Sequence, residues 1–317
     1  MGGDNHTYIY SLRDGSWEES ITLDEIYNDI KISGRTLLAT KYNNTSFTSE
    51  VYSYNIQDCT QDMPTQSPSP SSPPTISSLP TTTFECFGAN DGGQDGVLYK
   101  AVRSYVDQDC ANNEECDIAQ AYGWPMNSWC LGNVKSMYEL FKSMDTFNED
   151  INGWNTSSVT SMRYMFSNAE AFNRDLSKFD TSSVTDMRDM FSGATSFNRD
   201  VSSFDTSSVF DMAWMFAGAT AFNRDISNFD TSSVSRMNGM FRGASLFNGD
   251  VSNFDTSRVA DMRFMFEGAS SFDQDLCSWR DSFPYNLAPL IFEDSGCTYQ
   301  DTPQEDQKGP FCASDCQ

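Results

Sequence analysis

The chain has 317 residues, of which 45 are acidic and 20 basic, so its formal net charge is −25. This excess of negative charge disfavours nucleic acid and anionic membrane surfaces as partners. No apolar run in the sequence reaches the roughly 18–20 residues of a membrane span, so we expect no span in this chain.

Residues 1–58 alternate apolar and polar side chains between turn signals, which predicts short antiparallel strands. The stretches YIYSLRDGSWEE and IKISGRTLLAT resemble blades of an FG-GAP-type β-propeller. Fewer than two blades are present, whereas a propeller needs about four to eight. We therefore interpret 1–58 as a partial β-propeller-like fragment of a truncated chain; a small self-standing β-domain is the alternative. Residues 59–83, rich in Pro, Ser and Thr, predict an extended linker.

Residues 84–132 are predicted to cap the N-terminal end of a repeat array. Val97, Ala101, Val102, Tyr105 and Val106 have the spacing of one amphipathic helix. The stretch AYGWPMNSWC then supplies two tryptophans that could cover the end of the array. A repeat array needs such atypical end units to close its core.

A 25-residue unit recurs five times in residues 147–271, within a repeat region predicted over 133–283. Such a period predicts stacked supersecondary units. In the copy DTSSVTDMRDMFSG, Val184, Met187, Met190, Phe191 and Ala194 have the spacing of one helix face. The other half, FNRDVSSFD, has room for a short strand centred on the residues Leu176, Val201, Ile226 and Val251. The predicted fold class is therefore an α/β solenoid of strand-plus-helix coils with a small N-terminal all-β fragment.

The repeat pattern FNxD(I/V/L)SxFDTSSVxxMxxMFxGA resembles the BspA-like leucine-rich-repeat surface proteins of mycoplasmas, bacteria and diatoms. The flanking residues 120–134 and 276–316 are similar to those of diatom members. The resemblance covers roughly residues 84–317. It implies a solenoid fold and a secreted or surface-attached protein, and it implies no reaction.

Nine cysteines without a C-x-x-C pair favour disulfides, and residues 284–317 are predicted to form a disulfide-containing C-terminal cap. Proximity and motif favour the pairs Cys110–Cys116, Cys277–Cys297, Cys312–Cys316 and Cys86–Cys130, among 105 possible connectivities, with Cys59 left over. Glycosylation sequons lie at Asn5, Asn43, Asn44 and Asn155. The sequence MGGDNHTYIY lacks a signal peptide, which we attribute to truncation of a secreted or cell-surface protein.

The sequence gives no support to catalysis. Its one histidine is His6, no phosphate-binding glycine loop or histidine-based metal motif is present, and we expect no cofactor. Carboxylates instead recur identically in every unit, whereas an active site needs one locally distinct constellation. We expect a protein that is not an enzyme.

Stacking would align repeated side chains into columns. The candidate binding face consists of aspartate and serine residues beside the predicted strand: Asp175, Ser177, Asp200, Ser202, Asp225, Ser227, Asp250 and Ser252. A hydrogen-bonded structural ladder and a ligand- or cation-binding surface are both open for this column. The column Asn148, Asn173, Asn198, Asn223 and Asn248 is interpreted as a ladder of side chains bonded to backbone.

The predicted function is an extracellular or cell-surface interaction module that binds protein or glycan. Two alternatives remain: a purely structural wall or coat component, and a protein that binds calcium, ice or mineral. The ice or mineral alternative would use the regular array formed by Thr181, Thr206, Thr231 and Thr256.

Overall fold

The computed structural model describes residues 7–13, 16–23, 29–33, 36–43, 48–55, 82–93 and 95–316, with side chains from residue 86 onward. It divides into two compact units, Met1–Cys86 and Phe87–Gln317. Most of the predicted linker, Cys59, Asn5 and Asn44 lie outside the described residues, as does the side chain of Asn43.

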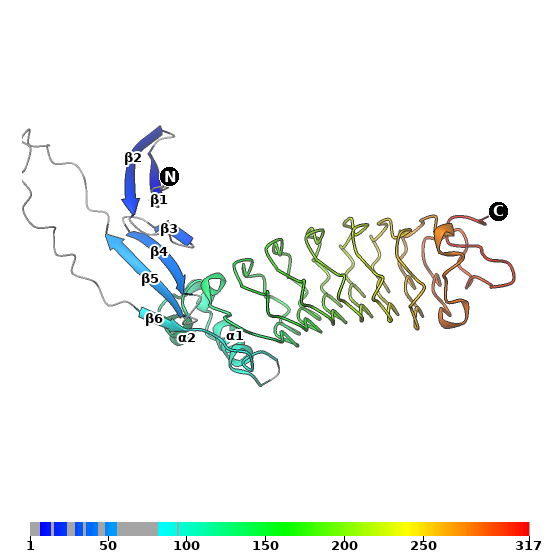
Figure 1. The fold of residues 1–317 in the computed structure, drawn as a ribbon, viewed down its shortest axis with the longest axis horizontal. Coiled ribbons are helices and arrows are strands. Elements are labelled where there is room, and N and C mark those ends of the chain that lie inside the picture. Colours follow the sequence, from blue (N-terminus) through cyan, green and yellow to red (C-terminus); the bar gives the residue numbers. More distant parts are fainter. Residues whose placement is uncertain are drawn as a thin grey trace, which may run out of the picture. The chain divides into compact units, whose positions relative to one another are not determined.

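The first unit consists of antiparallel strands (Figure 1). One sheet pairs β1 (Thr7–Arg13) with β2 (Ser16–Leu23). The second sheet has four strands in chain order: β3 (Asp29–Ser33), β4 (Thr36–Asn43), β5 (Thr48–Asn55) and β6 (Thr82–Glu85).

The second unit begins with the cap. Helix α1 (Val97–Asp107) forms where the apolar spacing predicts a helix, and it buries Leu98, Ala101, Val102 and Tyr105. Helix α2 (Asp117–Tyr122) and the 3-10 turns η1 (Cys110–Asn112) and η2 (Met126–Ser128) follow. The Trp129 ring stacks on Trp154 of the first repeat with centroids 6.3 Å apart, so the cap covers the apolar end of the repeats.

The repeats form coils that stack side by side (Figure 1). Within a coil, amides bond three residues back, for example from Met215 N to Met212 O at 3.2 Å. Alternate amides bond to the next coil: Met212 N to Arg236 O at 3.0 Å and Trp214 N to Asn238 O at 2.9 Å. We call the six segments that carry these bonds the ladder: 136–143, 161–168, 186–193, 211–218, 236–243 and 261–268.

The predicted strand-plus-helix solenoid is wrong, because the described repeats contain consecutive turns joined by isolated parallel bridges. Positive φ angles, such as 60° at Trp214 and 66° at Gly218, interrupt any helix. Each is the third residue of a turn, where a type II turn requires positive φ. The predicted strand centres, such as Val201, instead open a tight turn closed by Phe204 N donating to Val201 O at 3.0 Å.

The apolar positions of the repeat are buried as their periodicity predicts. Val184, Met187, Met190 and Ala194 have no exposed surface. Phenylalanines stack from coil to coil, and the Phe191 ring lies 5.4 Å from that of Phe166 in the preceding coil. The core is therefore a continuous column of Phe and Met shared by adjacent coils.

The C-terminal segment closes the stack. It continues the ladder, because Met262 N donates to Leu287 O and Phe266 N donates to Ile291 O, each at 2.9 Å. In this segment the amide equivalent to Phe264 N is Leu290 N, which donates to the side-chain oxygen of Thr302 at 3.1 Å rather than to a further coil. The ladder therefore does not continue in regular form beyond this segment.

The cysteines of the C-terminal cap pair differently from the prediction. Cys110–Cys116 forms as expected, but the cap contains Cys277–Cys316 and Cys297–Cys312 instead of Cys277–Cys297 and Cys312–Cys316. Cys312 forms antiparallel bridges with Asp275 and Tyr299, so the chain folds back on itself. This return brings together cysteines that are distant in sequence. Cys86 and Cys130 are each disulfide-bonded.

Candidate functional site

The predicted Asp–Ser face consists of Asx-type turns that stabilise their own coils. Each aspartate accepts a hydrogen bond from the backbone amide of the serine two residues on, at 2.8–3.0 Å, in the pairs Asp175–Ser177, Asp200–Ser202, Asp225–Ser227 and Asp250–Ser252. The bond from the Ser202 amide lowers the pKa of Asp200. The exposed carboxylates thus have a structural role, and ligand binding by them stays a prediction.

The side chains of two other columns also form hydrogen bonds with the backbone. The asparagine ladder is confirmed, because Asn173 Oδ1 accepts from Asn198 N at 3.1 Å and the neighbouring coils repeat this bond. The threonines are only 1–2% exposed, and Thr206 Oγ1 donates to Asp230 O at 3.0 Å. This burial removes the exposed array on which ice or mineral binding was based.

The outward side of the ladder has different chemistry in each coil. The central ladder position holds in turn Glu139, Tyr164, Asp189, Trp214, Gly239 and Phe264, while the inward Met and Phe of the same segments repeat. We call the outward side chains of the six ladder segments the ladder face. Because the backbone is the same in all six coils, the fold does not require a particular residue here.

Several of these residues also carry backbone strain. φ is +58° at Tyr164, +60° at Trp214 and +61° at Phe264, whereas Gly239 takes the same conformation without a side chain. A positive φ in a bulky residue costs on the order of 1–3 kcal/mol and is often associated with functional sites. Glycine would fit this position better in every coil.

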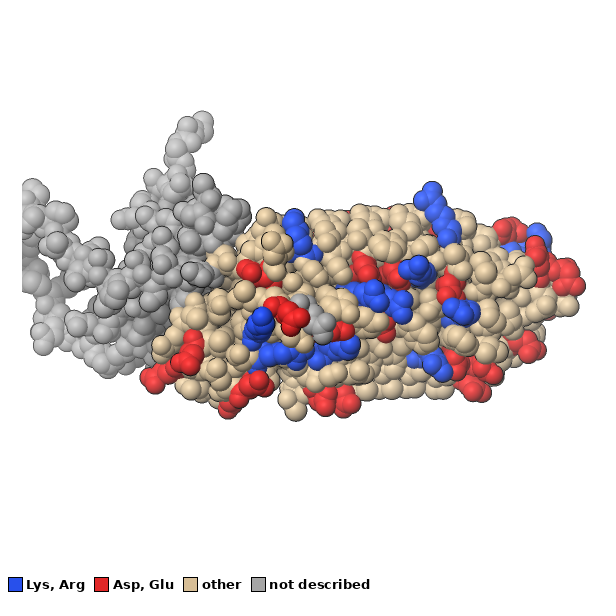
Figure 2. Space-filling view, turned by 90° about the horizontal axis from the view of Figure 1, so that it is seen from below, with Lys and Arg blue, Asp and Glu red and all other residues tan. Residues whose placement is uncertain are grey.

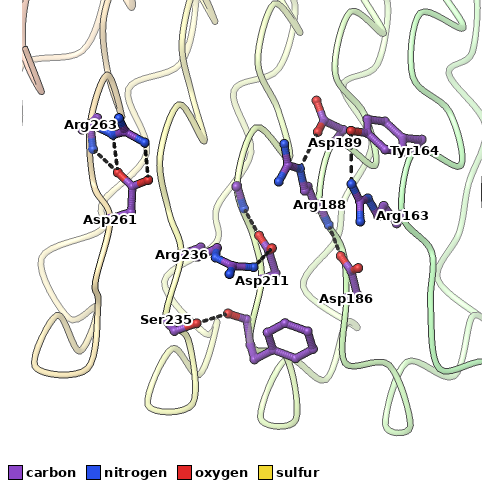
Figure 3. Close-up of polar contacts among 12 residues, drawn as sticks. Arg163, Tyr164, Asp186, Arg188, Asp189, Asp211, Ser235, Arg236, Asp261 and Arg263 are labelled. Atoms are coloured by element: carbon purple, nitrogen blue, oxygen red, sulfur yellow. Dashed lines mark hydrogen bonds and ion pairs between the residues drawn. The ribbon is translucent and has the colours of Figure 1, made fainter. Parts of the chain in front are cut away.

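The charges of the ladder face are balanced, in a chain whose net charge is −25. Its six basic and six acidic residues are Lys142, Arg163, Arg188, Arg236, Arg242, Arg263, Glu139, Asp186, Asp189, Asp211, Asp261 and Glu267. On the face shown in Figure 2, basic and acidic side chains lie interspersed along the stack. Figure 3 shows the Arg236–Asp211 pair, which joins neighbouring coils, and pairs within single coils such as Arg263–Asp261.

Cations form the outer layer of these pairs. The Arg236 side chain is 54% exposed and that of its partner Asp211 only 4%; Arg242 is 50% and Glu267 20% exposed. Arg263 is 53% exposed, and its Nε and second guanidinium nitrogen hold the two Asp261 oxygens at 2.9 and 2.8 Å. In the pairs Lys142–Glu139 and Arg188–Asp189 the cation is likewise more exposed than the carboxylate. The outermost charged groups of these pairs are therefore cationic.

Burial of the inner carboxyls affects their ionisation. It raises the pKa of Asp186, which also faces the neighbouring carboxylate of Asp211. Burial likewise raises the pKa of Asp189, despite the opposing effect of Arg188. The cost of keeping these acids ionised is offset by the cations above them.

An aromatic cluster lies among the exposed arginines. A Cβ atom added at Gly239 would lie 2.7 Å from Trp214 Cδ2 and closer still to two other ring carbons, so the indole covers the backbone of the next coil. The Arg242 guanidinium lies 5.7 Å from the Trp214 ring centre and 5.8 Å from that of Phe264. These distances suit cation–π contacts with both rings.

Sequence reasoning missed the ladder face because it assigned these segments to helices and gave weight only to repeated chemistry. The available signal was variation at fixed positions of a near-identical repeat. A cluster of Asp275, Cys277 and Cys316 has the geometry of a metal site, but its cysteines form a disulfide with each other and so offer no thiolate. Asn155 is exposed, as its predicted glycosylation would require.

Comparison with known proteins gives one family. A model described as "Mycoplasma protein of unknown function, DUF285" matches residues 112–212 and 198–294, which together span more than half of the chain. No curated protein and no solved structure matches. Within the described part of the chain, no helix is both long and apolar enough to cross a membrane.

Proposed function

The chain belongs to the DUF285 family, and we propose that it is a non-catalytic binding protein that holds a partner protein against its ladder face. The observation that carries this proposal is that the outward positions of the ladder differ in chemistry from coil to coil, whereas the inward Met and Phe of the same segments repeat. Inward residues repeat because they pack; the outward ones differ even where the backbone strain would favour glycine. Such positions suit recognition of a partner without repeat symmetry.

The composition of the face favours a protein partner. Its larger outward residues are Tyr138, Tyr164, Trp214, Phe264 and five arginines, with Lys142 as its single lysine. Protein interfaces are enriched in aromatic residues and arginine and depleted in lysine. Tryptophan, tyrosine and arginine also dominate binding hot spots. A glycan is the other partner class that the aromatic rings could serve.

We place the protein outside the cell or on its surface. The disulfides Cys110–Cys116, Cys277–Cys316 and Cys297–Cys312 suit an oxidising compartment. The resemblance of the repeats to BspA-like surface proteins supports the same location. A purely structural coat component is the competing function, and it would not need a variable face.

Site-specific photo-cross-linking tests the proposal. A benzophenone amino acid is introduced at Asn238 of the ladder face or, as a control, at exposed Ser203 on another side of the coil. Each variant is irradiated on intact cells of the source organism, and the adducts are identified by mass spectrometry. We expect one recurrent protein adduct from position 238 and none from position 203. Equal adduct patterns, or none from either position, would refute the proposed function.

A further inference from the structure

The exposed arginines of the two coils that follow Trp214 form the part of the ladder face with the most defined chemistry. Arg236, Arg242 and Arg263 come from two neighbouring coils, and each is about half exposed. Each is hydrogen-bonded to a less exposed carboxylate. Arg236 and Arg242 bond Asp211 and Glu267 of neighbouring coils, and Arg263 bonds Asp261 of its own coil. Such a pre-ordered guanidinium loses less side-chain entropy when a partner binds.

Resting on the proposed function, we infer that the ladder face binds an acidic segment of its partner protein, with carboxylates on Arg236, Arg242 and Arg263 and an apolar or aromatic side chain on Trp214 and Phe264. Charge complementarity carries this choice. The inner acids neutralise the arginines overall but lie beneath them, so the first groups that a partner meets are guanidinium donors. Guanidinium donors match the geometry of carboxylates in bidentate pairs.

The rest of the described surface makes this patch distinctive. Another column exposes carboxylates, such as Asp200 and Asp225, that would repel an acidic segment. A second arginine row, Arg174, Arg199 and Arg224, lies directly beside those aspartates in sequence, and its Nε atoms donate to backbone carbonyls of the preceding coil at 2.6–2.8 Å. That row offers a matched control, because it carries the same three charges on a different side of the coil.

The test measures binding of defined probes to the full chain by fluorescence anisotropy. The probes are a short labelled peptide of alternating glutamate and tyrosine, its lysine–tyrosine counterpart, an oligomer of a uronic acid and a neutral glucan. We expect binding of the glutamate peptide alone, weakened by salt. The triple variant R236Q/R242Q/R263Q should weaken it about tenfold, as expected for three exposed charge pairs. The control R174Q/R199Q/R224Q should bind like the wild type.

Loss of the arginines leaves Asp211 nearly buried without its partner, so the triple variant could unfold. Asn238→Asp avoids this problem, because it adds a carboxylate to the face and keeps every ion pair. This variant should bind the glutamate peptide several-fold more weakly, and its melting temperature should equal that of the wild type. Three results would overturn the inference. The two triple variants could weaken peptide binding equally, or Asn238→Asp could leave peptide binding unchanged in a folded protein. The wild type could also bind the lysine peptide, the glucan or the uronate more tightly than the glutamate peptide. A cross-linked protein partner at position 238 would leave the proposed function standing in each of those cases.

Discussion

The contact between Trp214 and Gly239 gives a quantitative test of the turn ladder. Alanine at Gly218, where φ is +66°, meets only ordinary contacts, the nearest atoms of Gly193 being 3.7 Å away. Its cost is therefore backbone strain alone, about 1–2 kcal/mol. Alanine at Gly239, where φ is +62°, incurs the same strain and also collides with the Trp214 indole. Overpacking of this kind adds about 1–3 kcal/mol.

We therefore expect Gly239→Ala to cost about 2–5 kcal/mol and Gly218→Ala about 1–2 kcal/mol. Removing the indole first should cancel the collision, so Gly239→Ala in a Trp214→Ala background should cost only the strain. The double-mutant cycle should give a coupling of about 1–3 kcal/mol. Urea unfolding followed by far-ultraviolet circular dichroism measures all four proteins. A coupling below about 0.5 kcal/mol would show that the indole does not lie on Gly239.

Three further changes test the core, a buried column and an exposed one. Phe191→Ala should cost about 3–5 kcal/mol in a urea melt, since its ring is fully buried, and hydrogen exchange should show the loss spreading first to adjacent coils. Thr206→Val should cost about 1–3 kcal/mol by leaving the Asp230 carbonyl unbonded, whereas Thr206→Ser should cost less. Hydrogen bonds from Ser207 lower the pKa of Asp205 in the folded protein. The Asp205 carboxylate therefore stabilises the fold above its unfolded pKa, and this stabilisation is lost as pH falls through the lower folded pKa. Asp205→Asn should keep the turn, as Asn155 does in the first coil, and flatten the acid side of the melting-temperature profile.

The sequence predicted the repeat, its buried positions and the cap helix. These follow from periodicity and from side-chain chemistry, which do not depend on how the backbone closes its hydrogen bonds. Val184, Met187 and Phe191 face inward in a helix and in a chain of turns alike, because both bring residues three or four apart to one side. Burial was therefore predictable where the secondary structure was not.

The helix prediction failed because the neighbouring coils offer the amides another partner. In an isolated segment, Met212 and Phe216 would donate four residues back. In the stack they donate to Arg236 and Met240 of the next coil, and only alternate amides bond within the coil. No single repeat contains this information, since it arises from having an identical copy alongside. The disulfide pairs failed for a related reason, as Cys277 and Cys316 meet only after the chain turns back.

The ladder face escaped prediction because repetition was taken as a sign of function. The repeated polar side chains prove to bond the backbone: Asn173 bonds the next coil, Thr206 bonds a carbonyl and Asp200 closes its own turn. A polar residue that recurs in every coil is explained by the hydrogen bond that it forms within the stack. The residue that differs has no such explanation, and its chemistry is the better guide to a partner.

Phe264 provides the sharpest test of this view. Its φ of +61° is strained, and the equivalent Gly239 shows that the coil closes without a side chain at this position. Phe264→Gly should relieve about 1–2 kcal/mol of strain, offset in part by the loss of the ring's own contacts and by the greater freedom of an unfolded glycine. We expect a melting temperature equal to or above that of the wild type, together with weaker binding of the glutamate–tyrosine peptide. Destabilisation by more than about 2 kcal/mol, in the range of a lost core residue, would mean that the ring is kept for packing. The strain would then be no argument for a binding face.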